Sequence, residues 1–172
     1  MVKALFPGTF DPIHYGHMDI AERASRLFDE VVMAVYDKPL KSLMFSPEER
    51  MDLVRESFKD NPKINVTGYS GLTIEFARQI NAQVIVRGLR VFSDFEFEFR
   101  MGLANQRLAP DIETVAFITA EEHTFLSSST VREIASLHGD VSSMVPPHVK
   151  TAFNKKVNDL GDGNSPPNAL RD

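Results

Sequence analysis

Two histidines, His14 and His17, lie in a stretch that a regular helix or strand cannot span. Residues 6–17 include two prolines and two glycines, and proline fixes φ and removes a donor whereas glycine permits unusual backbone. An apolar run precedes this stretch and a helical pattern follows it, which predicts a strand-to-helix turn. Histidines three residues apart can share one face of the first helical turn. Such a turn offers backbone N–H groups and the positive end of the helix dipole, and both favour phosphate.

Short apolar runs alternate with helical patterns along the rest of the chain. This order predicts an α/β fold, with a Rossmann-like, doubly wound parallel sheet of five strands and helices on both faces. We expect one domain over residues 1–157 and a disordered tail over 158–172, where glycine, proline and polar residues dominate. The strands are predicted at 2–6, 31–36, 64–67, 84–86 and 114–118, and the helices at 16–28, from 46 to before 61, at 73–80, 93–108 and 129–137, and from 146.

Composition excludes several classes of protein. A net charge of −5 argues against general binding of nucleic acid. The absence of cysteine removes thiolate nucleophiles and disulfides from consideration. We see neither a signal peptide nor an apolar stretch of membrane-spanning length, so we expect a cytoplasmic protein that does not bind membranes.

Basic and hydroxyl residues gather where the predicted strands end. Ligands of an open α/β sheet bind beyond the carboxyl ends of its strands, so these residues should meet at one rim. Arginine binds phosphate through a bidentate fork, lysine acts as a point charge, and hydroxyl groups fill the remaining acceptor sites. The rim therefore predicts a site for several phosphate groups. The residues are Thr9, His14, His17, Lys38, Lys41, Arg87, Arg90 and the segment 122–129.

Each of these residues also has an ordinary explanation when taken alone. Lys41 could be a solvated loop lysine, the serines of 127–129 could only cap a helix, and Glu98 could be a solvated helix residue. Thr130 and Glu133 could form a capping box. The histidine pair is weak support for a metal site, because no third ligand is evident. The prediction of a phosphate site therefore depends on these residues lying close together at one rim of the sheet.

The motifs then show a resemblance. Gly8-Thr9-Phe10-Asp11-Pro12 with His14-Tyr15-Gly16-His17 resembles the H-x-G-H signature of the nucleotidyltransferase superfamily. Residues 1–157 resemble the bacterial phosphopantetheine adenylyltransferase family. The motifs that point to this family are Met44-Phe45 with Glu48-Glu49-Arg50, Val86-Arg87-Gly88-Leu89-Arg90, Asp94-Phe95-Glu96 and Phe125-Leu126-Ser127-Ser128-Ser129.

The resemblance implies a reaction and the residues that carry it. The adenylyl group of ATP would pass to 4′-phosphopantetheine, with Mg²⁺ arriving with ATP, and the products would be dephospho-coenzyme A and pyrophosphate. It further implies a homohexamer and possible feedback by coenzyme A. Catalysis would depend on His17, Lys41 and Arg90, and phosphopantetheine would bind at Thr9, Lys41, Thr73 and Arg87. ATP would bind at Thr9, Phe10, His17, Gly88, Leu89, Arg90, Glu98, His123, Thr124, Phe125, Leu126, Ser127, Ser128 and Ser129.

Two positions depart from the family pattern, and two other functions stay open. His14 stands where threonine is frequent in the family, and Phe97 where tyrosine is common. One alternative is a sister nucleotidyltransferase with another acceptor, such as nicotinamide mononucleotide or glycerol 3-phosphate. The other is a non-catalytic nucleotide sensor on the same fold.

Overall fold

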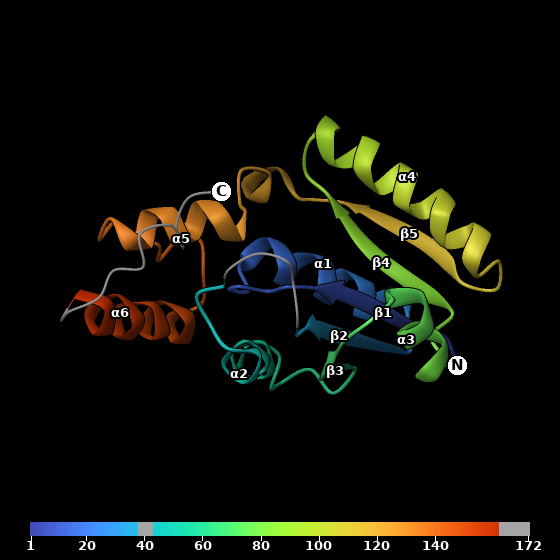
Figure 1. The fold of residues 1–172 in the computed structure, drawn as a ribbon, viewed down its shortest axis with the longest axis horizontal. Coiled ribbons are helices and arrows are strands. Elements are labelled where there is room, and N and C mark those ends of the chain that lie inside the picture. Colours follow the sequence, from blue (N-terminus) through green and yellow to red (C-terminus); the bar gives the residue numbers. More distant parts are fainter. Residues whose placement is uncertain (38–42, 162–172) are drawn as a thin grey trace.

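Five parallel strands form one sheet in the computed structural model of the chain, which describes residues 1–37 and 43–161. The strand order is β3-β2-β1-β4-β5, and every pairing is parallel (Figure 1). This confirms the predicted Rossmann-like sheet. The chain order reverses between β1 and β4, which is where an open α/β sheet binds its ligands. The strands are β1 (Lys3–Gly8), β2 (Glu30–Tyr36), β3 (Ile64–Tyr69), β4 (Val84–Leu89) and β5 (Glu113–Ile118).

Helices cover both faces of the sheet because β1 and β2 present apolar side chains to each face. Side chains of α1 and α2 pack in the larger of two buried clusters, and those of α3 pack in the smaller one with Leu5 and Ile85. Helices α5 and α6 lie beyond the carboxyl ends of the strands (Figure 1). The helices are α1 (Tyr15–Leu27), α2 (Pro47–Ser57), α3 (Thr73–Gln79), α4 (Phe92–Leu108), α5 (Ser128–Ser136) and α6 (Pro147–Gly161), with a short 3₁₀ turn, η1 (Glu121–His123).

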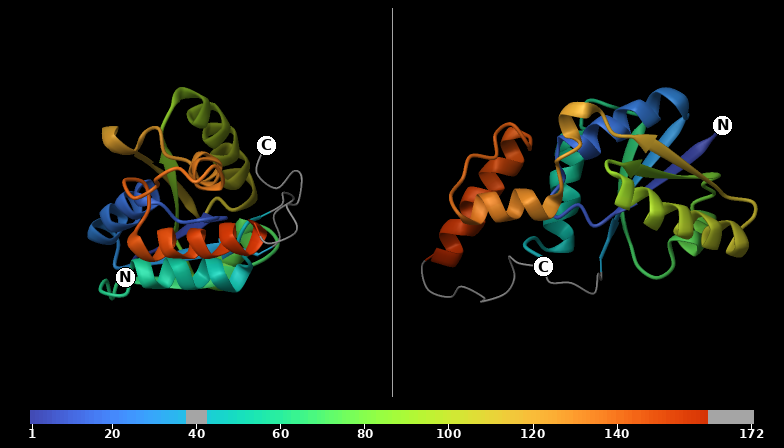
Figure 2. Two further views of the ribbon diagram at one scale, coloured as in Figure 1. Left: turned by 90° about the vertical axis from the view of Figure 1, so that its left-hand side faces the viewer. Right: turned by 90° about the horizontal axis from the view of Figure 1, so that it is seen from above.

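Helices α2 and α6 lie side by side although ninety residues separate them (Figure 2). The Ser57 hydroxyl lies 3.1 Å from His148 Nε2, and Lys156 pairs with Glu49 at 2.8 Å. Helix α2 begins as its sequence predicts, because the Ser46 hydroxyl and the Glu49 carboxylate cap each other's backbone N–H groups. Helix α6 is therefore anchored against α2.

Several boundaries differ from the sequence prediction; strands β1 and β3, for example, each end two residues later than expected. Strand β4 continues three residues past Val86, because the polar Arg87 and its two successors still pair with β5. Helix α5 is capped by Ser127, whose hydroxyl accepts the N–H of Thr130, so the capping box predicted for Thr130 is wrong. Helix α6 runs to Gly161, beyond the end expected after Val157. Residues 162–172 lie outside the described residues, so the disorder predicted for the tail stays a prediction.

Over the described ranges, each helix is too short or too polar to cross a membrane.

Candidate active site

A cavity of about 640 Å³ opens at the carboxyl ends of the strands. Its wall includes β1 and the turn after it, the start of α1, the ends of β3 and β4, and the serines before α5. Eleven of the predicted ligand-binding residues meet there, so the convergence expected at the rim is observed. They are Thr9, Phe10, His17, Thr73, Arg87, Gly88, Arg90, Glu98, Ser127, Ser128 and Ser129.

His14 and His17 form a reciprocal cap at the start of α1. The N–H of His17 donates to His14 Nδ1 at 3.4 Å, and the N–H of His14 donates to His17 Nδ1 at 3.3 Å. The two rings stack with their centroids 3.7 Å apart. Because each Nδ1 accepts a hydrogen bond, the proton of each neutral ring is on Nε2. His17 therefore offers an Nε2–H donor on the cavity wall.

Both imidazoles are held neutral. Burial lowers the pKa of His14 to about 3, with the positive charge of Arg90 contributing to the shift. Burial is also the main reason why the pKa of His17 lies well below its ordinary value. The nearby His14, Arg90 and Arg87 lower this pKa further through charge repulsion. A neutral donor suits developing negative charge without itself changing protonation.

This pair predicts a pH dependence of folding. Since both pKa values are lower in the folded state, the unfolded state binds more protons below pH 6.5, and the free energy of unfolding should fall as the pH drops. Each histidine contributes a slope of up to about 1.4 kcal/mol per pH unit. Urea unfolding at pH 7.0, 6.0 and 5.0 measures it. His14→Thr keeps a capping residue and should lose about half of the slope.

The control for that experiment is His138→Asn. His138 is exposed with φ of 60°, a conformation that asparagine tolerates. This variant should keep the wild-type slope. An unchanged slope in His14→Thr would contradict the neutral state of His14.

Carboxylates orient the two arginines of the wall. Arg87 forms a bidentate pair with Glu98, with its Nε 2.7 Å from one carboxylate oxygen, and it also donates to the Pro7 carbonyl. Arg90 donates from Nε to Asp94 at 3.0 Å and from Nη1 to the Leu126 carbonyl at 2.7 Å. Both guanidinium groups are thus held by α4 at the cavity edge. The predicted ATP ligand Glu98 contacts the predicted phosphopantetheine ligand Arg87 directly.

On its β2–β3 side the cavity is lined by tyrosine and threonine side chains in place of arginines. The Tyr69 hydroxyl lies 3.0 Å from the Thr73 hydroxyl, and the rings of Tyr36 and Tyr69 are 5.1 Å apart. Sequence reasoning missed both tyrosines, although Tyr36 ends a predicted strand and Tyr69 lies two residues after one. Lys41 lies outside the described residues. Aromatic faces and hydroxyl groups here fit a less charged portion of a ligand than the arginine side does.

Five predicted ATP ligands lie off this wall in the described structure. Leu89 lines a separate hollow of about 230 Å³ between α4 and β5. Leu126 is fully buried and contributes its carbonyl to Arg90. His123, Thr124 and Phe125 lie in or just after η1, at the approach to the serine segment. Their role as ligands stays a prediction.

Three buried residues behind the wall have no assigned role from sequence. Arg50 donates to the carbonyls of Thr9 and Tyr36, each at 2.7 Å. Asp11 and Arg132 meet beneath the turn that follows β1. Little in the sequence indicates these roles. Arg50 follows Glu48-Glu49 and Arg132 precedes Glu133 in predicted helices, and such polar neighbours are typical of a solvated arginine.

Because Gly88 has no side chain, Ile20 of α1 can pack directly against β4 beside the cavity. A Cβ atom at this position would lie 2.5 Å from the Cδ1 atom of Ile20, so a side chain would force Ile20 of α1 to move. The bare backbone of Gly88 therefore forms part of the wall between α1 and β5.

Protein ligands for a metal ion are not grouped in the part of the chain that the structure describes. No set of three or more His, Cys, Asp or Glu side chains is close enough to hold one there.

The parallel sheet with its H-x-G-H turn places the chain in the nucleotidyltransferase class, and residues 5–134 match the cytidylyltransferase-like family model. The chain is 54% identical over 155 residues to the phosphopantetheine adenylyltransferase of Roseiflexus sp. (strain RS-1), covering 90% of this chain and 97% of that protein. It is 48% identical to the phosphopantetheine adenylyltransferase of Desulfitobacterium hafniense (strain Y51), covering 89% and 94%. The chain therefore belongs to the phosphopantetheine adenylyltransferase family.

A solved structure supports the fold alone. It is titled a putative nicotinate-nucleotide adenylyltransferase from Vibrio parahaemolyticus, and it superposes with a TM-score of 0.69 at 23% identity, covering 90% of this chain and 99% of that one.

Proposed function

We propose that the chain transfers the adenylyl group of ATP to 4′-phosphopantetheine, which gives 3′-dephospho-coenzyme A and pyrophosphate. The observation that carries this proposal is the convergence of His17, Arg90 and the serines of 127–129 with Thr73 and Arg87 in one cavity. The relatives of similar length that share about half of their residues with this chain are named phosphopantetheine adenylyltransferases.

The chemistry follows from charge. An oxygen of the acceptor phosphate attacks the α-phosphorus of ATP, a new P–O bond forms, and the bond to the β-phosphate oxygen breaks, so pyrophosphate leaves. A phosphate monoester is ionised near pH 7, and a strong general base is therefore unnecessary. Catalysis then depends on positioning and on stabilisation of the charge that develops in the transition state.

The residues of the wall divide into three roles. His17 would donate its Nε2–H to the α-phosphate oxygens in the transition state. Arg90 and the serine segment would hold the β- and γ-phosphates. Arg87, with Lys41 and Thr73, would hold the phosphopantetheine, and the pairing of Arg87 with Glu98 would fix the guanidinium while two anionic substrates approach.

Pyrophosphate release tests the function. The wild-type chain should release pyrophosphate from ATP and Mg²⁺ only when 4′-phosphopantetheine is added. Nicotinamide mononucleotide, glycerol 3-phosphate and CTP, tested in the same assay, distinguish a sister nucleotidyltransferase. ATP binding without turnover on any acceptor would overturn the proposal and favour the sensor.

Four further features accompany this proposal. Mg²⁺ would arrive with ATP, since it usually keeps waters and binds through substrate phosphates. A homohexamer would bury the apolar side chains that α4 exposes, among them Phe92 with 83% of its surface accessible. Feedback by coenzyme A and a cytoplasmic location stay predictions from the sequence.

A further inference from the structure

Asp11 and Arg132 form a buried pair just outside the cavity wall. Asp11 is 1% exposed and Arg132 is 4% exposed. Arg132 Nη1 lies 3.5 Å from the Asp11 carboxylate and donates to the Asp11 backbone carbonyl at 2.7 Å. The wall of the cavity includes neither residue. A role in the reaction would therefore be exerted through their neighbours.

The Asp11 carboxylate holds the chain on the acceptor side of the site. Its two oxygens accept the N–H groups of Met44 and Phe45, each at 2.9 Å. These residues follow the segment 38–42, to which Lys41 belongs, and precede α2. Asp11 therefore fixes the backbone of Met44 and Phe45 just ahead of α2.

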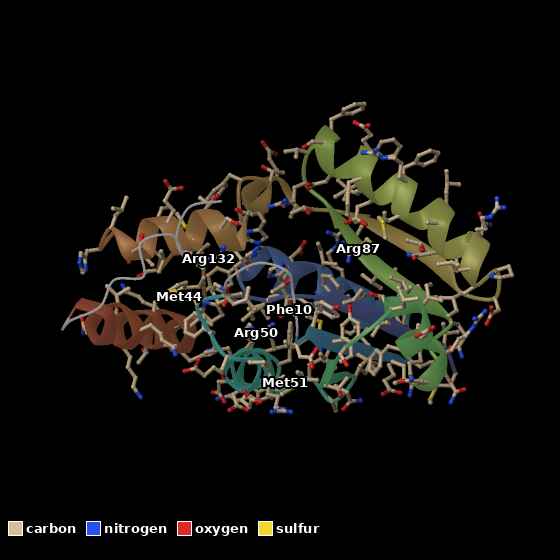
Figure 3. All side chains as sticks on the ribbon, viewed as in Figure 1. Phe10, Met44, Arg50, Met51, Arg87 and Arg132 are labelled. Carbon is tan, nitrogen blue, oxygen red and sulfur yellow. The ribbon has the colours of Figure 1, made fainter. Side chains whose placement is uncertain are left out.

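Arg132 holds the opposite side, where the serines enter α5. Its Nη2 lies 3.4 Å from the hydroxyl of Ser129, and the hydroxyl of Ser128 donates to the Pro12 carbonyl at 2.9 Å. The first turn of α5 is thus attached to the turn after β1 by two side chains. Figure 3 shows Arg132 and Met44 near each other between α5 and α2, with Phe10 beside them.

We propose that Asp11 and Arg132 are positioning residues that hold the backbone of Met44 and Phe45 and the serine segment in a fixed relation across the turn after β1. This inference rests on the proposed function, since in-line attack needs the acceptor phosphate and the triphosphate in line. A misplacement of about 1 Å can cost about 100-fold in rate. A buried ion pair is weak support for stability by itself, because apolar residues of similar volume often replace one without loss.

A pair of variants separates positioning from folding. Arg132→Met leaves the Asp11 carboxylate buried without its cation, and we expect a lower Tm. The double variant Asp11→Asn with Arg132→Met has neither charge and should recover part of that loss, because the amide oxygen of asparagine can still accept one of the two N–H groups. Its kcat should nevertheless stay about 100-fold below wild type, with smaller changes in the KM of each substrate. Arg78→Met, which breaks the exposed pair with Asp111, is the control and should change neither quantity.

Recovery of kcat together with Tm in the double variant would overturn the inference. The wild-type assay is run first, so that a wild type without turnover contradicts the proposed function instead. A second readout does not depend on turnover. Arg132→Met should speed hydrogen exchange at the Met44 and Phe45 amides at least tenfold relative to β1 amides, although Arg132 itself touches neither residue. Unchanged exchange there would equally overturn the inference.

Discussion

Replacing His17 with alanine should lower kcat by about 10²–10³, the usual cost of removing one donor to a developing oxyanion. The donor is the neutral Nε2–H, because Nδ1 accepts the His14 N–H and burial keeps the pKa of the ring well below its ordinary value. Ground-state binding of ATP should change much less, since the contact strengthens in the transition state. Steady-state kinetics with ATP and 4′-phosphopantetheine, together with equilibrium ATP binding, measure both quantities.

Two controls define the role of His17. His17→Gln keeps an N–H donor near the position of Nε2 and should retain part of the rate, whereas His14→Thr keeps the cap and should remain active. Because the donor does not titrate near neutrality, kcat should stay flat between pH 7 and 8.5. Loss of ATP binding in proportion to kcat in His17→Ala would instead indicate a binding or structural role.

Local sequence patterns predicted the fold because central strands such as β2 are continuous apolar runs and helices such as α1 carry apolar residues at helical spacing. They also predicted the rim, since the turn that leads to His17 follows the first strand and the serines of 127–129 open a helix. The length of the apolar-periodic stretch decided correctly that residues 93–108 form a helix, although its alternating phenylalanines also fit a strand.

The contacts that orient the site could not be predicted in this way. The pairing of Arg87 with Glu98 joins a strand to a helix, and the contact of Arg132 with Asp11 spans 121 residues. Neither depends on local periodicity, because tertiary packing alone decides which carboxylate or carbonyl a guanidinium reaches. The prediction of the α5 cap was wrong for a related reason. Both Ser127 and Thr130 are good capping residues, but Ser127 is the last residue with extended backbone before the helix and is therefore the cap.

Replacing Arg50 with methionine should destabilise the fold and also impair the reaction. The fully buried guanidinium donates to the carbonyls of Thr9, Tyr36 and Phe45, which lie on three separate segments. Hydrogen bonds to charged groups contribute about 1.5–3 kcal/mol each, and relief from burying the charge offsets part of that sum. Burial indeed lowers the pKa of Arg50. We expect the free energy of unfolding in urea to fall by about 3 kcal/mol, which is within the range for breaking a buried network.

The same variant should lower kcat because Arg50 fixes the Thr9 carbonyl, and Thr9 lines the cavity. A loss of about tenfold or more is expected from misplacement of this turn. Arg55→Met on the same helix is the matched control: Arg55 is exposed and pairs with Asp52, so stability should change by less than about 0.5 kcal/mol. Arg50→Lys keeps the charge but cannot span three diverging carbonyls, and it should fall between the two. If Arg50→Met were as stable and as active as Arg55→Met, the three carbonyls would not depend on this guanidinium.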